Sequence, residues 1–318
     1  MKFTSNYLKS YLKRRLDRLL FLENWNVIIL KQGVEDFLHN PSLNSIIYRT
    51  RSSFANFFAD PFMVIRSGKM HIFMEKYDQF LKRGLIVRQD ISLDESGVEK
   101  CKKVSGISKN LHLSFPCTLE KDGKLYIIPE CIKSGRIAIY ELNLEANHCE
   151  LANILLDNAR YVDISVHKKD GIYYIFASRI EGYKNTQLDI FYTDDILTGK
   201  LSIHPKSPIR SGNYGSRMAG NLFEMNGKLM RPGQFSHKTY GDGMCIYSIK
   251  TLTKDAYEEY VTHQICGEDF GFDGLHTFSV CGDYIAIDVK KHSYNWRKLI
   301  TKLHRISLYK YIYRALSK

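Results

Sequence analysis

The sequence predicts an all-β protein, a single five-bladed β-propeller, from two observations. A short hairpin turn recurs at a nearly constant interval, and runs of β-branched, aromatic and other apolar residues flank every turn. The composition agrees, because 318 residues with 44% hydrophobic and 25% charged side chains suffice for a large core. Disordered chains and small disulfide-stapled scaffolds are therefore excluded.

The recurring turn places a glycine between two apolar runs at five points. The glycines are separated by 55, 48, 56 and 55 residues, and three turns contain the Asp-Gly or Asn-Gly pair that type I′ hairpins favour. A period near 50 residues with strand-forming residues on both sides is typical of a propeller blade. The five turns are Ser67-Gly68-Lys69, Asp122-Gly123-Lys124, Asp170-Gly171-Ile172, Asn226-Gly227-Lys228 and Cys281-Gly282-Asp283.

The formal net charge of +12 is concentrated at the two ends of the chain. Residues 1–20 carry +5 and residues 293–318 carry +7 without any acid, so the body between them is balanced. Apolar residues recur near helical spacing at both ends. We therefore expect a basic helical N-terminal segment over 1–44, the propeller over 45–291, and a basic amphipathic C-terminal helix over 292–318.

Two interpretations of these ends remain open. The helices lie on an anionic membrane surface, or they pack their apolar faces on the propeller. No apolar run approaches the ~20 residues that a membrane-spanning helix needs, and the 7 cysteines form no C-x-x-C pair. We expect a cytoplasmic protein, peripherally associated with the inner face of the membrane. A nucleic-acid partner is not expected, because the balanced body offers no basic groove.

Hairpin geometry gathers polar residues at one end of the propeller. In a two-residue hairpin, a residue eight before the turn glycine pairs with one about seven after it, away from the turn. Equivalent ends of all blades lie on one face around the axis. The rule places Asp60 beside Glu75, Phe115 opposite Glu130, Asp163 opposite Ser178 and Ala219 opposite Gln234, with His112, Ser114, Arg217, Arg231 and His276 at the same level.

Asp60 and Asp163 occupy corresponding positions in two blades. Both residues could simply cap strands or turns, where aspartate is common. A repeat of position across blades favours a shared site instead. The sequence thus predicts a polar site on the axis.

An ordered set of motifs resembles one known family. The chain is similar to the N-terminal domain of plant glucosamine inositolphosphorylceramide transferase and its bacterial relatives, from about Trp25 to Lys291. That domain is similar in turn to the five-bladed glycoside hydrolases of family 43. The motifs are Ala59-Asp60-Pro61-Phe62, His112-Leu113-Ser114-Phe115-Pro116, Ile128-Pro129-Glu130, Val162-Asp163-Ile164-Ser165, Gly220-Asn221-Leu222-Phe223, Arg231-Pro232-Gly233-Gln234, Tyr240-Gly241 and Gly274-Leu275-His276-Thr277.

The hydrolase resemblance implies three carboxyl groups, and this chain matches two. Asp60 matches the general base of blade 1, and Asp163 matches the aspartate of blade 3 that orients and tunes. The general acid of blade 4 has no counterpart, because residues 214–220 contain no carboxylate and Arg217 stands in that neighbourhood.

This departure favours transfer over hydrolysis. Hydrolysis expels an alkoxide that needs a proton, whereas a sugar nucleotide expels a diphosphate that needs positive charge. We expect an enzyme that moves a sugar from a nucleotide or phosphate donor to a polysaccharide or glycolipid acceptor, with Asp60 as the base. The expected catalytic residues are Asp60, Asp163 and Glu130, and the expected substrate-binding residues are Glu75, His112, Ser114, Arg217, Arg231, Gln234, His276 and Arg51.

Two alternatives remain open at this point. One is a furanosidase-type glycoside hydrolase in which Glu130 or Glu75 replaces the missing acid. The other is a carbohydrate-binding propeller without catalysis. No cofactor and no metal site are predicted, although a divalent ion stays compatible with the sequence. The expected partners are the sugar donor, the glycan or glycolipid acceptor, and an anionic membrane surface.

Overall fold

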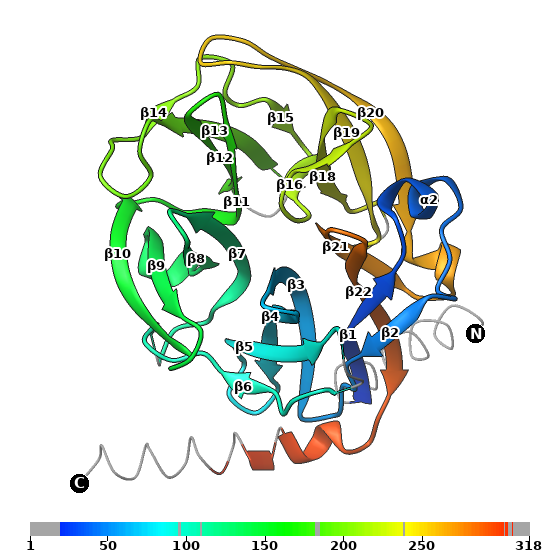
Figure 1. Ribbon diagram of the computed structural model, residues 1–318. Helices are drawn as coiled ribbons and strands as arrows, with labels where there is room; N and C mark the ends of the chain where they lie inside the picture. The colour runs from blue at the N-terminus through cyan, green and yellow to red at the C-terminus, as the bar shows by residue number, and fades with distance from the viewer. Residues whose placement is uncertain are drawn as a thin grey trace, which may run out of the picture.

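Five antiparallel sheets surround a central axis as the blades of a propeller (Figure 1). This computed structural model describes residues 20–301, apart from 95, 96, 109, 182–184 and 238, and also residues 303, 304 and 307. Each blade begins with an inner strand at the axis and ends with an outer strand at the rim. The predicted all-β, five-bladed propeller is confirmed.

Blades 1 and 2 have the same up-and-down order, in which consecutive strands pair. The 3₁₀ turn η1 (Ile132–Ser134) links two strands of blade 2. Blade 1 consists of β3 (Asn56–Arg66), β4 (Lys69–Asp78), β5 (Arg83–Ser92) and β6 (Lys102–Lys103), and blade 2 of β7 (Ser114–Lys121), β8 (Lys124–Glu130), β9 (Ile137–Asn143) and β10 (His148–Leu156).

Blades 3 and 4 each contain a fifth, short strand. In blade 3 the extra strand joins β13, and in blade 4 the inner position is divided between β16 and β17, which both pair with β18. Blade 3 consists of β11 (Tyr161–Lys169), β12 (Ile172–Glu181), β13 (Asn185–Thr193), β14 (Ser202–Ile203) and β15 (Arg210–Ser211), and blade 4 of β16 (Tyr214–Met218), β17 (Phe223–Met225), β18 (Lys228–Phe235), β19 (Gly243–Leu252) and β20 (Tyr257–Cys266).

Blade 5 closes the ring with strands from both ends of the chain. β1 pairs with β22 in unbroken register from Phe21 opposite Tyr294 to Lys31 opposite Tyr284. The ring is thus held by backbone hydrogen bonds between segments more than 250 residues apart. Its strands are β21 (Gly274–Cys281), β22 (Tyr284–Tyr294), β1 (Phe21–Lys31) and β2 (Ile46–Arg49), with α2 (Val34–His39) between β1 and β2 and the turn η2 (Gly267–Phe270) before β21.

The expected helical N-terminal segment over 1–44 is wrong for its second half. Residues 21–31 form β1, and the only helix of α type between 21 and 44 in the described chain is the six-residue α2. Val27 to Leu30 are fully buried against the neighbouring sheets, which a basic surface helix would not achieve. Residues 1–19 lie outside the described residues. At the other end the propeller extends to Tyr294.

Most of the expected C-terminal helix lies outside the described residues as well. Residues 298–301, 303 and 304 are helical. Throughout the part of the chain that the structure describes, every helix falls short of the length and apolarity needed to cross a bilayer.

A β-bulge interrupts every inner strand at the same level. The register shifts directly after Ala59, Ser114, Val162, Tyr214 and Leu275. Such bulges re-aim side chains and bend the strand. The residues at the bulges are Asp60, Phe115, Asp163, Gly215 and His276, and the first four have positive φ values of 54°, 41°, 49° and 70°.

The bulges correct the pairing that hairpin counting predicts. The residue opposite Glu75 is Ala59, not Asp60, because the bulge adds one residue to β3. By the same shift Ser114 is opposite Glu130 and Val162 is opposite Ser178. In blade 4, Arg217 is opposite Gln234.

Because the ring is closed by β1 and β22, a cavity between them should destabilise the whole propeller. Ile28, fully buried, lies opposite Ile287. We expect Ile28→Ala to lower the free energy of unfolding by about 2–5 kcal/mol in urea titrations. Ile203→Ala, at a site that is 57% exposed, should change it by less than about 0.5 kcal/mol. Equal effects of the two substitutions would contradict this account of ring closure.

Candidate active site at the propeller axis

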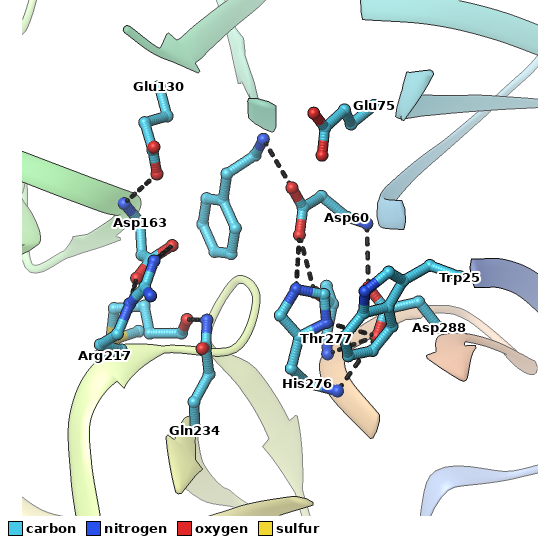
Figure 2. A network of polar contacts seen from close by, with 12 residues as sticks. Trp25, Asp60, Glu75, Glu130, Asp163, Arg217, Gln234, His276, Thr277 and Asp288 are labelled. Atoms are coloured by element: carbon cyan, nitrogen blue, oxygen red, sulfur yellow. Dashed lines mark hydrogen bonds and ion pairs between the residues drawn. The ribbon is translucent and has the colours of Figure 1, made fainter. Parts of the chain in front are cut away.

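Charged side chains from all five blades meet at the axis, in two hydrogen-bonded clusters (Figure 2). One cluster surrounds Asp60 and the other surrounds Asp163. Both aspartates stand at the bulges of inner strands, where positive φ turns the backbone sharply. The bulges therefore direct the Asp60 and Asp163 side chains into the site.

In the first cluster His276 lies between two carboxylates. Its Nδ1 is 2.8 Å from Asp288 Oδ1, and its Nε2 is 3.4 Å from Asp60 Oδ1. Asp288 Oδ1 also accepts the backbone N–H groups of His276 and Thr277, at 3.1 and 2.9 Å. Asp288 Oδ2 accepts the Asp60 N–H at 3.0 Å. The position of the imidazole ring is thus fixed by Asp288.

Asp60 itself connects three blades. Its Oδ2 accepts the backbone N–H of Phe115 in blade 2 at 3.1 Å, and its Oδ1 accepts the Thr277 hydroxyl of blade 5 at 3.2 Å. The residue is buried. A buried carboxylate needs such donors, because it has lost its water. Asp60 therefore links three blades and also presents a carboxylate at the candidate active site.

The protonation states in this cluster follow from burial and charge. Burial raises the pKa of Asp60 to about 6, and the attraction of His276 opposes this rise. Burial lowers the pKa of His276, but the Asp288 and Asp60 carboxylates outweigh it and raise the pKa overall. Asp288 keeps a lowered pKa, despite burial, through His276 and the backbone donors. A carboxylate with a pKa near 6 is a good general base at neutral pH.

Aromatic residues cover the outer side of His276. The Trp25 ring of β1 lies 4.1 Å from the imidazole, centroid to centroid, and Tyr240 meets the imidazole edge-on at 5.4 Å. Gly241 permits this packing, since a Cβ there would lie 2.8 Å from the Trp25 ring. The aromatic cover keeps the imidazole and Asp288 away from solvent.

The second cluster is a bidentate ion pair between blades 3 and 4. Arg217 Nε is 2.5 Å from Asp163 Oδ2, and Arg217 Nη2 is 3.0 Å from Asp163 Oδ1. The guanidinium also lies 5.1 Å from the centroid of the Tyr240 ring. The Asp163 N–H donates to Glu130 Oε2 at 3.1 Å. With 23% of its side chain exposed, Arg217 remains open to a ligand on one side.

Two further carboxyl groups at the axis have raised pKa values. Burial and the nearby Asp163 raise the pKa of Glu130 to about 8. Burial, with Asp60 and Glu130 adding to it, holds the pKa of Glu75 well above its usual range. His112 Nε2 lies 3.8 Å from Glu75 Oε1, which has no hydrogen-bond partner among the described residues. With a pKa of about 8, Glu130 is protonated at neutral pH.

A pocket of about 330 Å³ opens beside Arg217. Its size is at the lower end of the range for small-molecule sites. Gln234 donates to the Met218 carbonyl at 2.8 Å, while its own buried Oε1 has no partner within the described chain. A buried acceptor of this kind can accept a hydrogen bond from a ligand hydroxyl or from water. The polar residues that line the pocket are Thr186, Asn213, Arg217, Gln234, Ser236 and Tyr240.

The structure brings most of the predicted site residues together. Ser114 is buried opposite Glu130. The fold places most of the predicted site residues near one another, and their roles as catalytic or binding groups remain predictions. The residues gathered at the axis are Asp60, Glu75, His112, Ser114, Glu130, Asp163, Arg217, Gln234 and His276.

Arg231 was expected to bind substrate, and this expectation is wrong. Its side chain is fully buried, and Nε and Nη2 each lie 2.7 Å from the Glu259 carboxylate of β20. Its Nη1 donates to the Gly215 carbonyl at 3.0 Å. The cause is the alternation of side chains along β18, which puts Arg231 and Gln234 on opposite faces. Arg231 is a structural residue of blade 4.

The structure does not bring Arg51 into the axial cluster either. Arg51 is exposed and lines a separate pocket of about 690 Å³, formed by residues 46–52 together with Asn26. It follows the outer strand β2, at the rim of blade 5, so it lies in a different place from the axial side chains.

Sequence reasoning missed Asp288, which orients His276. A signal was present, because Asp288 interrupts the apolar run Tyr284–Val289, and a carboxylate in a buried strand is rare unless it is paired. Thr277, whose hydroxyl donates to Asp60, directly follows His276 in the sequence.

Among the described residues, one group could hold a metal ion by distance, namely Asp60, His276 and Asp288. Both oxygens of Asp288 already accept backbone N–H groups, and the imidazole is hydrogen-bonded to Asp288. A donor set with its lone pairs engaged in this way fits a hydrogen-bonded triad better than a cation site. We derive no step through a metal.

Solved structures share the five-bladed propeller fold of this chain. The family 117 glycoside hydrolase Zg3597 from Zobellia galactanivorans is similar with a TM-score of 0.54 and 12% identity, over 85% of this chain and 91% of that one. The exo-β-1,3-galactanase 1,3Gal43A from Clostridium thermocellum is similar with a TM-score of 0.50 and 14% identity, over 64% and 49% of the two chains. At such identities the likeness shows the fold.

Comparison of the amino-acid sequence shows the family to which this chain belongs. Residues 19–270 match the family described as glucosamine inositolphosphorylceramide transferase 1, N-terminal, and the chain belongs to this family. The transferase of that name from Oryza sativa subsp. japonica is 30% identical over 210 residues, which cover 64% of this chain and 28% of the relative. The one from Arabidopsis thaliana is 28% identical over 225 residues, covering 69% and 29%. The chain spans less than a third of these relatives, and the expected family resemblance is confirmed.

The raised pKa of Glu130 predicts a pH dependence of stability. Between the usual glutamate pKa of about 4.5 and its folded value of about 8, the unfolded chain releases this proton and the folded chain retains it. The contribution of Glu130 to the free energy of unfolding should therefore fall as pH rises through that interval. Urea titrations of the wild type and Glu130→Gln at pH 5 and pH 8 should show the variant gaining relative stability at pH 8. A difference that is independent of pH would contradict a protonated Glu130.

Proposed function

We propose that this chain transfers a sugar from a phosphate-linked donor to a hydroxyl of a glycolipid or polysaccharide acceptor. One observation carries the proposal: a guanidinium, that of Arg217, stands at a 330 Å³ pocket where the resemblance to hydrolases implies a carboxylic acid. A cation suits a phosphate leaving group, and a carboxylic acid suits an alkoxide. The family supports a transferase assignment.

Arg217 is the group that would hold the donor phosphate. Asp163 binds Nε and Nη2 and fixes the plane of the guanidinium. Among the described residues, Arg217 Nη1 has no hydrogen-bond partner, so it can donate to a phosphate oxygen. Gln234 and the other polar side chains of the pocket would bind sugar hydroxyls.

Asp60 is the group that would activate the acceptor. Its carboxylate takes the proton of the acceptor hydroxyl, and that oxygen attacks the anomeric carbon while the bond from carbon to phosphate oxygen breaks. The electron pair of this bond leaves with the phosphate, beside Arg217. His276, held by Asp288, supplies the positive charge that keeps Asp60 ionised before the reaction.

A second candidate is hydrolysis of a furanoside, and Glu130 favours it. With a pKa of about 8, this buried group is protonated at neutral pH and able to act as a general acid. Burial also raises the pKa of the Glu75 carboxyl group at the axis. A binding module without catalysis is the third candidate, because the chain covers only part of its named relatives.

The first prediction concerns the base. Asp60→Asn should lower the rate of sugar transfer by about 10²–10⁴, measured as release of nucleoside diphosphate from a panel of sugar nucleotides. The variant should also lose about 1–3 kcal/mol of stability, because an amide cannot accept from Phe115, Thr277 and His276 together. Full activity of Asp60→Asn would remove Asp60 from the mechanism.

The second prediction separates transfer from hydrolysis. Arg217→Ala should weaken the binding of nucleoside diphosphates by about 10–150-fold in calorimetry, since a charge-assisted bond is lost. Arg136→Ala, a surface arginine paired with Asp157, serves as the matched control and should bind normally.

The same protein preparation should be screened on aryl furanosides. Cleavage without a nucleotide, sensitive to Glu130→Gln, together with absent nucleotide binding at millimolar concentration, would establish the hydrolase instead. If the protein shows neither glycosidase activity nor nucleotide binding, the third candidate, a carbohydrate-binding module, is favoured.

A further inference from the structure

Apolar side chains after β22 face outward. Residues 298–301, 303 and 304 are helical, and Trp296, Ile300 and Leu303 precede or lie within this segment. Their exposed fractions are 65%, 41% and 65%. Ile300 and Leu303 are three residues apart in the helical segment and share one of its faces, and Trp296 stands in the turn that leads into it. We call these three residues the apolar stripe.

The opposite face of this segment contacts the propeller with polar and charged groups. Thr301 is 2% exposed, and the Lys298 ammonium donates to the Phe21 carbonyl. The Arg297 guanidinium lies 5.9 Å from the Phe54 ring, and the His304 ring lies 5.4 Å from Phe80. A helix that packs on a core does the reverse and turns its apolar face inward. The described part of the tail therefore does not follow the interpretation in which its apolar face covers the propeller.

The apolar stripe lies at the same end of the propeller as the axial site. Phe54 precedes β3 and Phe80 follows β4, so both stand at the end of blade 1 opposite the hairpin turn at Gly68. The bulge at Asp60 is near that end too. Figure 1 shows the segment, in orange-red, alongside blade 1. A surface that covers the stripe would thus lie at the same end of the propeller as the axial site, on the side of blade 1.

Charge identifies what covers the stripe. Residues 293–318 contain seven Lys and Arg residues without an acid, residues 1–20 carry a formal +5, and the body is balanced. A second copy of this chain would bring like charges together, whereas an anionic bilayer supplies opposite charge and an apolar interior. Basic residues next to Trp, Ile and Leu are the composition of an interfacial helix.

We infer that the protein docks on an anionic lipid surface through Trp296, Ile300 and Leu303, with the site end of the propeller beside the lipid. If the proposed function is combined with this docking geometry, the acceptor is a lipid-linked one. Only this consequence rests on the proposed function. The docking itself needs neither donor nor acceptor.

The test is co-sedimentation of the full chain with vesicles of phosphatidylcholine containing 30% phosphatidylglycerol, a composition chosen at about the anionic content of a charged leaflet. The triple variant W296S/I300S/L303S keeps every charge and should bind at least about tenfold more weakly, because three apolar side chains no longer leave water on docking. The matched control is L151S/I203S/V261S, whose side chains are 56%, 57% and 50% exposed on outer strands. It should bind as the wild type does.

Fluorescence gives an independent readout in the wild type. The chain has 2 tryptophans, and Trp25 is buried while Trp296 is exposed. A blue shift on adding the anionic vesicles is expected, and W296F should abolish it. Asp60→Asn should bind vesicles normally, so loss of sugar transfer and loss of docking can be told apart.

Three results would overturn the inference. They are absence of wild-type binding to the anionic vesicles, binding of the triple variant equal to that of the wild type, and a dimer in sedimentation velocity that the triple variant converts to monomer. The last result would assign the stripe to a second copy of the chain. Circular dichroism of each variant checks that the propeller is folded.

Discussion

The carboxylate of Asp60 stands where blades 1, 2 and 5 meet, and the arrangement of the site depends on its hydrogen bonds. A buried carboxylate is unfavourable unless donors replace its water. Phe115 supplies a backbone N–H, Thr277 a hydroxyl and His276 a ring nitrogen, while Asp288 binds the Asp60 N–H. Burial raises the pKa of this candidate base, and its contacts with His276 and the Phe115 N–H in the neighbouring blades oppose the rise.

The second axial cluster shows how one substitution changes the chemistry of a shared fold. Arg217 neutralises Asp163 and takes up the blade-4 side of the axis. Burial and the Asp163 carboxylate raise the pKa of Glu130 to about 8, and the positive charge of Arg217 opposes this rise. Exchange of an acid for a guanidinium thus alters the protonation of its neighbours as well as the charge presented to a ligand. This physical coupling connects the departure of this chain from the expected hydrolase pattern to its proposed activity.

The sequence predicted correctly at which end of the propeller axis the site lies, but not which residues pair across the strands there. Counting from the turn glycines brought Asp60 and Asp163 to one end of the axis, because strand pairing is regular near a turn. It missed the one-residue bulges that place Ala59, not Asp60, opposite Glu75. A bulge depends on the packing of five inner strands, so nothing in a single hairpin sequence specifies it.

The sequence by itself determined the five blades, since turn glycines at a period near 50 residues and flanking apolar runs are local signals. Only the tertiary structure decided that Gln234 reaches the pocket while Arg231 pairs with Glu259, because side-chain direction along β18 depends on register. It also decided that residues 21–31 close the ring as β1, through hydrogen bonds to a strand at the far end of the chain. The outward direction of Trp296 was decided in the same way, by which side of the last helical segment contacts Phe54 and Phe80. Local patterns specify elements, whereas contacts between distant segments specify which side chains face one another.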